Sequence, residues 1–185
     1  FQETPPVSVI IAIRNGENSL PKLFTDLSAQ DYSGKMEFIL VDDESEDSTR
    51  ALIQEKSAND KRFIYESSLN GNLSLRFKKR ALDAGISRAC YDWLLFTDAD
   101  CHLKSGWVRG MTGYFTNDVD YVVGFSELER ENQLVTRFQA MDFFANLICY
   151  GDPPASLGMP YTGLSYTMSH SIIEKVEISY SFFEI

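Results

Sequence analysis

The sequence predicts an α/β fold, in which a mostly parallel, doubly wound sheet carries helices on both faces within a single domain. Two observations support this prediction. Short apolar runs alternate along the chain with segments of helical periodicity, in the order strand, helix, strand, helix, strand, helix, strand. Three of the apolar runs end abruptly in polar or acidic residues, as is typical of the carboxyl ends of parallel strands, where ligands bind.

The first strand and helix are predicted near the start of the chain. Residues 7–13, V-S-V-I-I-A-I, form the nearly continuous β-branched run expected of an interior parallel strand, and the run stops at the polar residues 14–16. Ser19 can cap the following helix, whose first turn tolerates Pro21. The apolar residues of this helix recur at helical spacing: Leu20, Leu23, Phe24 and Leu27.

The second strand, residues 36–41, is followed by three consecutive acids, Asp42, Asp43 and Glu44. Neighbouring carboxylates repel one another, so we expect a cation or hydrogen-bond donors to meet them. A helix is predicted over residues 49–56, with several candidate N-caps before it: Ser45, Asp47 and Ser48. For Asp47 and Ser48 the capping role is favoured over a functional one, whereas Asp43 lies at the strand tip and is favoured as a ligand-binding residue.

The third strand, residues 62–67, leads through a turn at Asn70 to a helix over residues 80–90. Lys78, Lys79 and Arg80 stand together at the start of this helix. Three cations are electrostatically misplaced at a helix N-terminus, which is already partially positive, unless an anion binds there. A phosphate is the favoured anion, and a solvated charged surface is the alternative.

The strand at residues 93–97 ends in Asp98 and Asp100, separated by one small residue. Buried strands seldom carry charge, and carboxylates at a strand tip suit Mg²⁺ or Mn²⁺ that is also held by substrate phosphates. A solvated turn is the alternative for these acids. Further along, we predict a helix over residues 103–115, a strand over 120–125 and an aromatic-rich helix over 134–150. Burial in the core is favoured for that helix over an acceptor-binding or membrane-facing role.

Composition excludes several classes of protein. The 185 residues carry a net charge of -10, which argues against binding to a nucleic-acid backbone. The three cysteines, Cys90, Cys101 and Cys149, are odd in number and lack metal-ligand spacing, so neither a disulfide framework nor a cysteine-based zinc site is expected, and a reducing compartment fits best. No apolar run approaches the roughly 18 residues of a membrane span. The chain begins at Phe1 without Met, which indicates a fragment of a longer protein.

Four blocks of the sequence together resemble the family 2 glycosyltransferases, which are inverting enzymes of GT-A fold that use nucleotide sugars. These blocks are V-S-V-I-I-A-I-R-N, I-L-V-D-D-E-S-E-D-S-T, K-K-R-A-L-D-A-G-I and L-L-F-T-D-A-D, in the family's order and spacing within residues 7–125. The resemblance implies a nucleotide-binding half at residues 7–102 and an incomplete acceptor-side half at 103–185. It further implies a nucleoside-diphosphate sugar donor, a saccharide or lipid acceptor, a divalent Mg or Mn cofactor, and a place on the cytoplasmic side, with any membrane association through segments outside this chain.

The same resemblance implies roles for individual residues. Asp98 and Asp100 match the D-x-D element, with Asp100 on the metal and Asp98 near the ribose and the metal-bound diphosphate. Asp43 would contact the uracil or other base. The remaining implied contacts to the nucleotide are Ala12, Asn15, Lys78 and Lys79. The family usually has Gly before this Lys, where the present chain has Phe77.

The acceptor side departs from the family pattern. Residues 151–171 take the place of the acceptor-side loop, and within them His170 is a candidate contact to the metal or diphosphate, although a lone His is more often a packed or surface residue. The general base is not identified, because the glutamates of residues 174–185 do not form the family's acid pair. Three explanations remain: the chain ends before the base, internal loops are missing from it, or catalysis has been lost.

The sequence therefore predicts a metal-assisted, inverting glycosyltransferase. The alternative is a non-catalytic nucleotide-sugar binding module that lacks the base. A nucleotidyltransferase is disfavoured, because its Gly-rich basic loop is not found after the first strand, where this chain has Arg14, Asn15 and Gly16.

Overall fold

The computed structural model describes residues 4–115, 121–124 and 165–169, and these residues contain a six-stranded sheet of order β3-β2-β1-β4-β6-β5. Its first four strands are parallel neighbours: β3 (Phe63–Ser67), β2 (Met36–Asp42), β1 (Val7–Ile13) and β4 (Trp93–Phe96). Strand β6 (Ser165–Ser169) runs antiparallel to β4 on one side and to β5 (Tyr121–Gly124) on the other. The prediction of a mostly parallel α/β sheet is confirmed.

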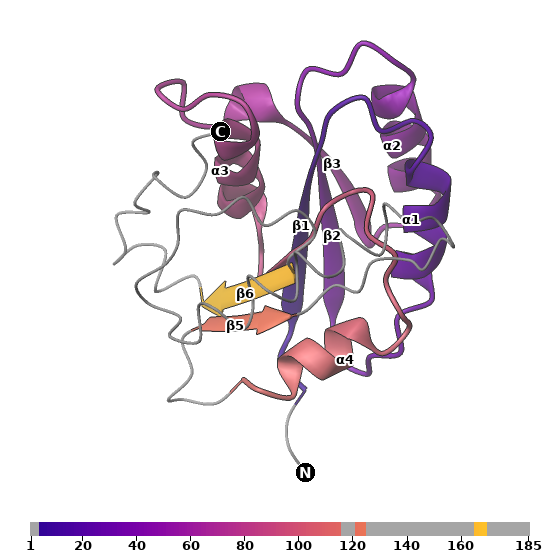
Figure 1. Cartoon of the computed structure of the whole chain (residues 1–185), viewed down its shortest axis with the longest axis vertical. Helices are drawn as coiled ribbons and strands as arrows, with labels where there is room; N and C mark the ends of the chain where they lie inside the picture. Colours follow the sequence, from indigo (N-terminus) through magenta and orange to yellow (C-terminus); the bar gives the residue numbers. More distant parts are fainter. Residues whose placement is uncertain (1–3, 116–120, 125–164, 170–185) are drawn as a thin grey trace, which may run out of the picture.

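Helices cover both faces of this sheet (Figure 1). Helices α1 (Leu20–Ser28), α2 (Thr49–Asn59) and α4 (Trp107–Thr112) pack on one face, where their buried residues share a cluster with Phe38 and Leu95. Helix α3 (Lys78–Arg88) covers the other face, and a short 3-10 turn, η1 (Ser68–Asn70), precedes it. Within the described ranges, no helix has the length and apolar character needed to cross a bilayer.

Strand β1 lies in the interior of the parallel part of the sheet. Its apolar side chains point to both faces, so helices must bury both faces. Val9 and Ile11 point into the core shared with α1 and α2, whereas Ile10 points into the core beneath α3. Helix α3 packs closely because it carries Gly85 at the contact: a Cβ there would overlap the Ile10 side chain and lie 3.0 Å from Val41 Cγ2. This close contact holds the start of α3 near the carboxyl ends of the strands.

Several local predictions differ from the structure. Ser19 is at the N-cap position of α1, but its hydroxyl donates a hydrogen bond to the carbonyl of Gly16 and caps no amide, so that capping prediction is wrong. Helix α3 begins at Lys78 rather than at residue 80, and α4 is shorter than the predicted helix over 103–115. Part of the expected acceptor-side loop, Ser165–Ser169, forms strand β6. The helix predicted over 134–150 lies outside the described residues.

Candidate functional site

The acids that follow β2 lie next to the end of β1. Ile13 and Asp42 are register partners, and the amide of Asp43 donates a 2.8 Å hydrogen bond to the carbonyl of Ile13, which extends the strand pairing by one residue. Asp43 is consequently buried, with 5% of its surface exposed. Each acid of the group has a cation nearby, as expected from their mutual repulsion: Asp42 lies 3.4 Å from Arg50, and Arg80 approaches the other two.

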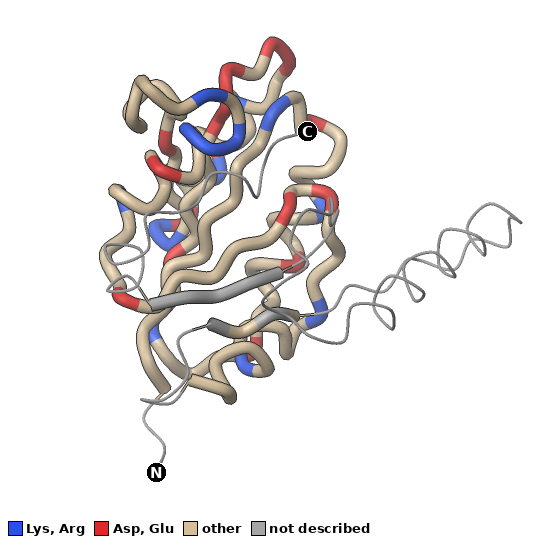
Figure 2. The backbone as a smooth tube through the Cα atoms, turned by 60° about the vertical axis from the view of Figure 1, so that its left-hand side comes forward, with Lys and Arg blue, Asp and Glu red and all other residues tan. Residues whose placement is uncertain are grey.

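The start of α3 connects the two acidic strand tips. Lys78 forms an ion pair with Asp98 after β4, and Arg80 forms one with Glu44 after β2. Nη2 of Arg80 also lies 3.9 Å from Oδ1 of Asp43. Figure 2 shows basic and acidic segments interleaved at the upper end of the molecule. Because one helix end reaches both sets of acids, Asp43 and Asp98 belong to the same edge of the sheet.

Asp43 and Arg80 present an unused acceptor beside an unused donor. Oδ1 of Asp43 and Nε of Arg80 are both buried and have no hydrogen-bond partner among the described residues. Buried polar groups are nearly always paired, so two unpaired atoms on neighbouring side chains make this place a candidate for ligand binding. Sequence reasoning treated Arg80 only as part of a basic triplet and gave it no contact with Asp43.

The loop after β1 is fixed to the loop after β2. Asn15 adopts a left-handed backbone (φ 52°), and its Oδ1 accepts a 2.9 Å hydrogen bond from the amide of Glu46. Its own amide donates to Oγ of Ser45 at 3.0 Å. Asp47 accepts from the amides of Thr49 at 3.0 Å and Glu17 at 3.1 Å. These bonds hold Asn15 at the edge of the site, while Ala12 is half-buried against the core beneath α3.

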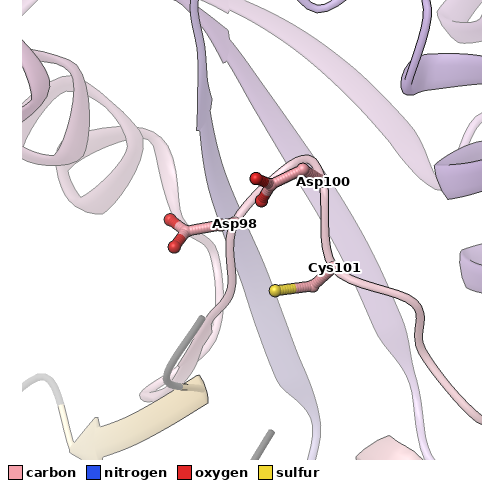
Figure 3. A group of neighbouring side chains, drawn as sticks. All are labelled: Asp98, Asp100 and Cys101. Carbon is pink, nitrogen blue, oxygen red and sulfur yellow. The ribbon is translucent and has the colours of Figure 1, made fainter. Parts of the chain in front are cut away.

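The turn after β4 gathers three potential metal ligands: Asp98, Asp100 and Cys101. Their ligand atoms all lie within 4.8 Å of one another, and their side chains point to the same side of the turn (Figure 3). Asp98 is half-buried and Asp100 is exposed. Two carboxylates in this arrangement fit a hard divalent cation. Sequence reasoning missed Cys101 at this site, although its position next to Asp100 was a signal.

Burial raises the pKa of the Cys101 thiol, an effect that a hydrogen bond with Thr97 only partly offsets. A thiol shielded from water in this way is favoured in its neutral form.

The segment that follows the turn is tied to the end of α1. Oδ2 of Asp26 accepts a 3.1 Å hydrogen bond from the amide of Leu103, and Oε1 of Gln30 accepts one of 3.0 Å from the amide of Val108. Gln30 also donates to the carbonyl of Lys104 at 3.0 Å. Asp26 on α1 and Gln30 just after its end are both buried. The core on the α1 face thereby fixes the position of the Asp98–Cys101 turn.

The structure thus brings together Asp43, Lys78, Asp98 and Asp100, with Asn15 at the margin. Lys79 lies half-buried in the first turn of α3. His170 lies outside the described residues, so its candidate role stays a prediction.

A mostly parallel α/β sheet with acids and a cationic helix start at its carboxyl edge belongs to the class of folds that bind ligands at that edge. Comparison with known families narrows this class: the family model described as "Glycosyl transferase family 2" matches residues 8–148. The chain belongs to this family.

Curated relatives agree with the family assignment. A 4,4'-diaponeurosporenoate glycosyltransferase from Staphylococcus haemolyticus is 38% identical over 104 residues, which cover 56% of this chain and 26% of that protein. An undecaprenyl-phosphate 4-deoxy-4-formamido-L-arabinose transferase from Pectobacterium carotovorum is 33% identical over 130 residues, covering 69% of this chain and 38% of that protein. The chain therefore spans well under half the length of either relative.

Solved structures share the fold. A mannosyltransferase from Pyrobaculum calidifontis, in complex with GDP-mannose and Mn²⁺, superimposes with a TM-score of 0.67 at 18% identity, over 95% of this chain and 48% of that one. Glucosyl-3-phosphoglycerate synthase from Mycobacterium tuberculosis, in complex with UDP, gives a TM-score of 0.62 at 17% identity, over 91% and 58% of the two chains. The fold is that of the GT-A glycosyltransferases.

Proposed function

We propose that this chain forms the donor-binding part of a glycosyltransferase, which transfers a sugar from a nucleoside diphosphate to an acceptor hydroxyl with inversion. One observation carries the proposal: the start of α3 pairs Lys78 with Asp98 and Arg80 with Glu44, so that the acids after β2 and β4 share one edge of the sheet. The solved relatives with the same fold contain GDP-mannose with Mn²⁺ or UDP, which supports a nucleotide in this place.

Asp43 and Arg80 would recognise the base. A nucleobase such as uracil presents an N–H next to a carbonyl, and this pair matches the unused Oδ1 of Asp43 and the unused Nε of Arg80. Because both protein atoms are buried, an analogue that cannot pair with them would leave them unsatisfied and bind weakly. Asn15 and Ala12 would line the same pocket from the end of β1.

The diphosphate would lie between the start of α3 and the Asp98–Asp100 turn. Lys78 and Lys79 offer positive charge there, and the first amides of α3 point in the same direction. Asp98 and Asp100 would hold the divalent cation, Mg²⁺ or Mn²⁺, which neutralises charge on the leaving diphosphate. Once that cation is bound, Lys78 can exchange its contact with Asp98 for a phosphate oxygen.

The proposal about the acceptor is supported only by the names of the relatives. Four of the curated relatives are named for undecaprenyl-linked substrates, which supports a lipid-linked or saccharide acceptor and a place at a membrane. We infer that this place is the cytoplasmic face. Inversion requires a base that takes the proton from the acceptor hydroxyl. No described acid is assigned this role.

Calorimetric titration of UDP and of GDP, each with and without Mn²⁺, tests the proposal. We expect one of the two to bind in a Mn²⁺-dependent manner, and Asp100→Ala to weaken that binding by at least about tenfold, which is ~1.4 kcal/mol. Asp92→Ala is the matched control, because Asp92 is an exposed acid just before β4, at its opposite end. Nucleotide affinity that is the same with and without Mn²⁺, or that is unchanged in Asp100→Ala, would overturn the proposed metal-binding role of Asp98 and Asp100.

A second candidate function is a non-catalytic nucleotide-sugar binding module, because the charged pairs described at the site, Lys78 with Asp98 and Arg80 with Glu44, would also serve nucleotide binding alone. Donor hydrolysis or sugar transfer by the full-length protein separates the two functions. Turnover that is lost in Asp98→Asn excludes the binding module, whereas nucleotide binding without any turnover supports it.

A further inference from the structure

Glu44 and Asp43 share the guanidinium of Arg80 unequally. Nη2 of Arg80 forms an ion pair with Oε2 of Glu44, and the same nitrogen lies 3.9 Å from Oδ1 of Asp43. It also donates a 3.5 Å hydrogen bond to Oγ of Ser68. The side chain of Glu44 is 53% exposed, whereas that of Asp43 is 7% exposed. The exposed acid therefore has the closer contact with the cation, and the buried acid has the longer one.

This arrangement is unfavourable for Asp43 alone. A buried carboxylate depends more on a direct charge-assisted hydrogen bond than an exposed one, because water already solvates the exposed charge. Such bonds are about 2.7–2.9 Å long, so a movement of about 1 Å would bring Arg80 into contact with Asp43. Instead, Oδ1 of Asp43 and Nε of Arg80 have no hydrogen-bond partner among the described residues. The ion pair with Glu44 thus keeps one acceptor and one donor available.

The loop after β2 holds Glu44 in place. Glu44 has a left-handed backbone (φ 55°), which residues with a Cβ seldom adopt. Oδ1 of Asp42 accepts a 3.1 Å hydrogen bond from the amide of Ser45, and this bond spans Glu44. Oγ of Ser45 in turn accepts a 3.0 Å hydrogen bond from the amide of Asn15. The backbone of Glu44 is therefore fixed on both sides, and its side chain reaches Arg80 from an anchored position.

We propose that Glu44 is a positioning residue of the base pocket: it holds the Arg80 guanidinium away from Asp43, so that Oδ1 of Asp43 stays available for a ring N–H of the base. This inference rests on the proposed recognition of the base by Asp43 and Arg80. When the base binds, its N–H pairs with Asp43 and its carbonyl accepts from Nε of Arg80, while the ion pair with Glu44 persists. Glu44 acts through Arg80 and need not touch the nucleotide.

The structure of a Glu44→Gln variant without nucleotide tests the first step. Glutamine keeps the size of the side chain and removes its charge. We expect Nη2 of Arg80 to move from 3.9 Å to within about 3 Å of Oδ1 of Asp43. An Arg80 side chain that stays at its wild-type distance from Asp43 would overturn the proposal, whether or not the protein binds nucleotides.

Nucleotide affinity tests the second step. In calorimetric titrations with UDP and GDP in the presence of Mn²⁺, Glu44→Gln should bind the preferred nucleotide at least about tenfold more weakly, because the base must displace Arg80 from Asp43. Loss of a negative charge near an anionic ligand would by itself strengthen binding, so a simple charge effect has the opposite sign. Glu46→Gln is the matched control: it removes the charge of an exposed acid in the same loop and should keep the affinity within about twofold.

A double-mutant cycle separates positioning from a general structural effect. The Arg80→Met background has no guanidinium to reposition, so Glu44→Gln should change its nucleotide affinity by less than about twofold. Equal losses with and without Arg80 would overturn the proposal. Wild type that binds one nucleotide, with the same affinity in Glu44→Gln, would overturn this inference alone. Wild type that binds neither UDP nor GDP would overturn the proposed function and this inference with it.

Discussion

Nη2 of Arg80 lies 3.9 Å from Oδ1 of Asp43, and these two side chains come from different elements, α3 and the tip of β2. Both are largely buried, with 16% and 7% of their side-chain surface exposed. The contact is longer than a hydrogen bond, so each group keeps capacity for a ligand while its charge is compensated. Arg80 therefore contributes both to the stability of the fold and to the proposed recognition of the base.

Arg80→Met should destabilise the protein. The change leaves the Asp43 carboxylate buried without its cation, and we expect the free energy of unfolding to fall by about 1–3 kcal/mol in urea titrations. Arg88→Met is the control on the same helix: Arg88 is 45% exposed and lies 3.8 Å from Glu66, so the loss should stay below about 1 kcal/mol. Equal losses in the two variants would contradict the role of Arg80.

Gly85→Ala should also lower the free energy of unfolding. The added methyl group would overlap Ile10, which is fully buried and cannot move aside. Overpacking costs about 1–3 kcal/mol, and the cost here should lie in the upper part of that range, about 2–3 kcal/mol, because Ile10 is fully buried. The better helix propensity of Ala returns about 1 kcal/mol, so we expect a net loss of ~1–2 kcal/mol.

Gly110→Ala in α4 is the control, because a Cβ there meets no atom within 4 Å. This variant should be neutral or more stable by up to about 1 kcal/mol. Thermal unfolding of both variants provides the measurement, and a Gly85→Ala protein as stable as wild type would contradict the close packing of α3 on β1.

Phe77→Gly should stabilise the protein. Phe77 precedes α3 with φ 55° and ψ -143°, a region that essentially only glycine adopts, and the residue is 70% exposed. Relief of strain gives about 1–3 kcal/mol, and the extra freedom of Gly in the unfolded chain costs about 0.5–1 kcal/mol, for an expected net gain near 1 kcal/mol. Leu73→Gly, at an exposed residue without positive φ, should lose up to about 1 kcal/mol. A loss in Phe77→Gly would show that this backbone is not strained.

Asp47 should make stability depend on acid pH. Desolvation acts to raise the pKa of Asp47. Hydrogen bonds from the side chain and amide of Thr49 and from the amide of Glu17 lower the pKa by more than desolvation raises it, so the pKa in the folded protein lies below its ordinary value. A depressed folded pKa means that its stabilisation is present above the unfolded pKa and is lost as the pH falls through the folded value.

We therefore expect wild type to lose more stability than Asp47→Asn as the pH falls from about 5 to about 3. Urea unfolding at several pH values measures the difference. Asp92→Asn, at an exposed acid, is the control and should follow the wild-type curve. Parallel curves for wild type and Asp47→Asn would contradict the assigned hydrogen bonds.

The sequence was informative wherever the signal is local. Continuous apolar runs gave β1, β2 and β4 nearly to the residue, and the polar residues that end these runs marked the edge where Asp43 and Asp98 lie. Parallel strands point their carboxyl ends the same way, so strand tips can be grouped from topology alone. The contact between Arg80 and Asp43 could not be predicted from the order of strands and helices. These two side chains meet because α3 packs on β1 through Gly85, and this packing is a tertiary effect.

Strand β6 was missed for a related reason. Residues 165–169 carry no strong strand pattern of their own, and their place in the sheet comes from pairing with β4, whose Trp93 lies opposite Ser169. Cys101 was missed because its significance comes from the turn that brings it to the two carboxylates. Pairings over such separations leave little trace in the local sequence.

The placement of β6 has a consequence for biosynthesis. A ribosome releases β5 well before β6, yet among the described strands β5 joins the sheet only through β6, which pairs with β4 on its other side. While the nascent polypeptide waits for residues 165–169, the outer border of β4 has unpaired backbone groups that can recruit a strand from another copy. Slow translation or premature termination in this interval should therefore favour intermolecular association, and chaperones that shield this border would be of most use at that moment.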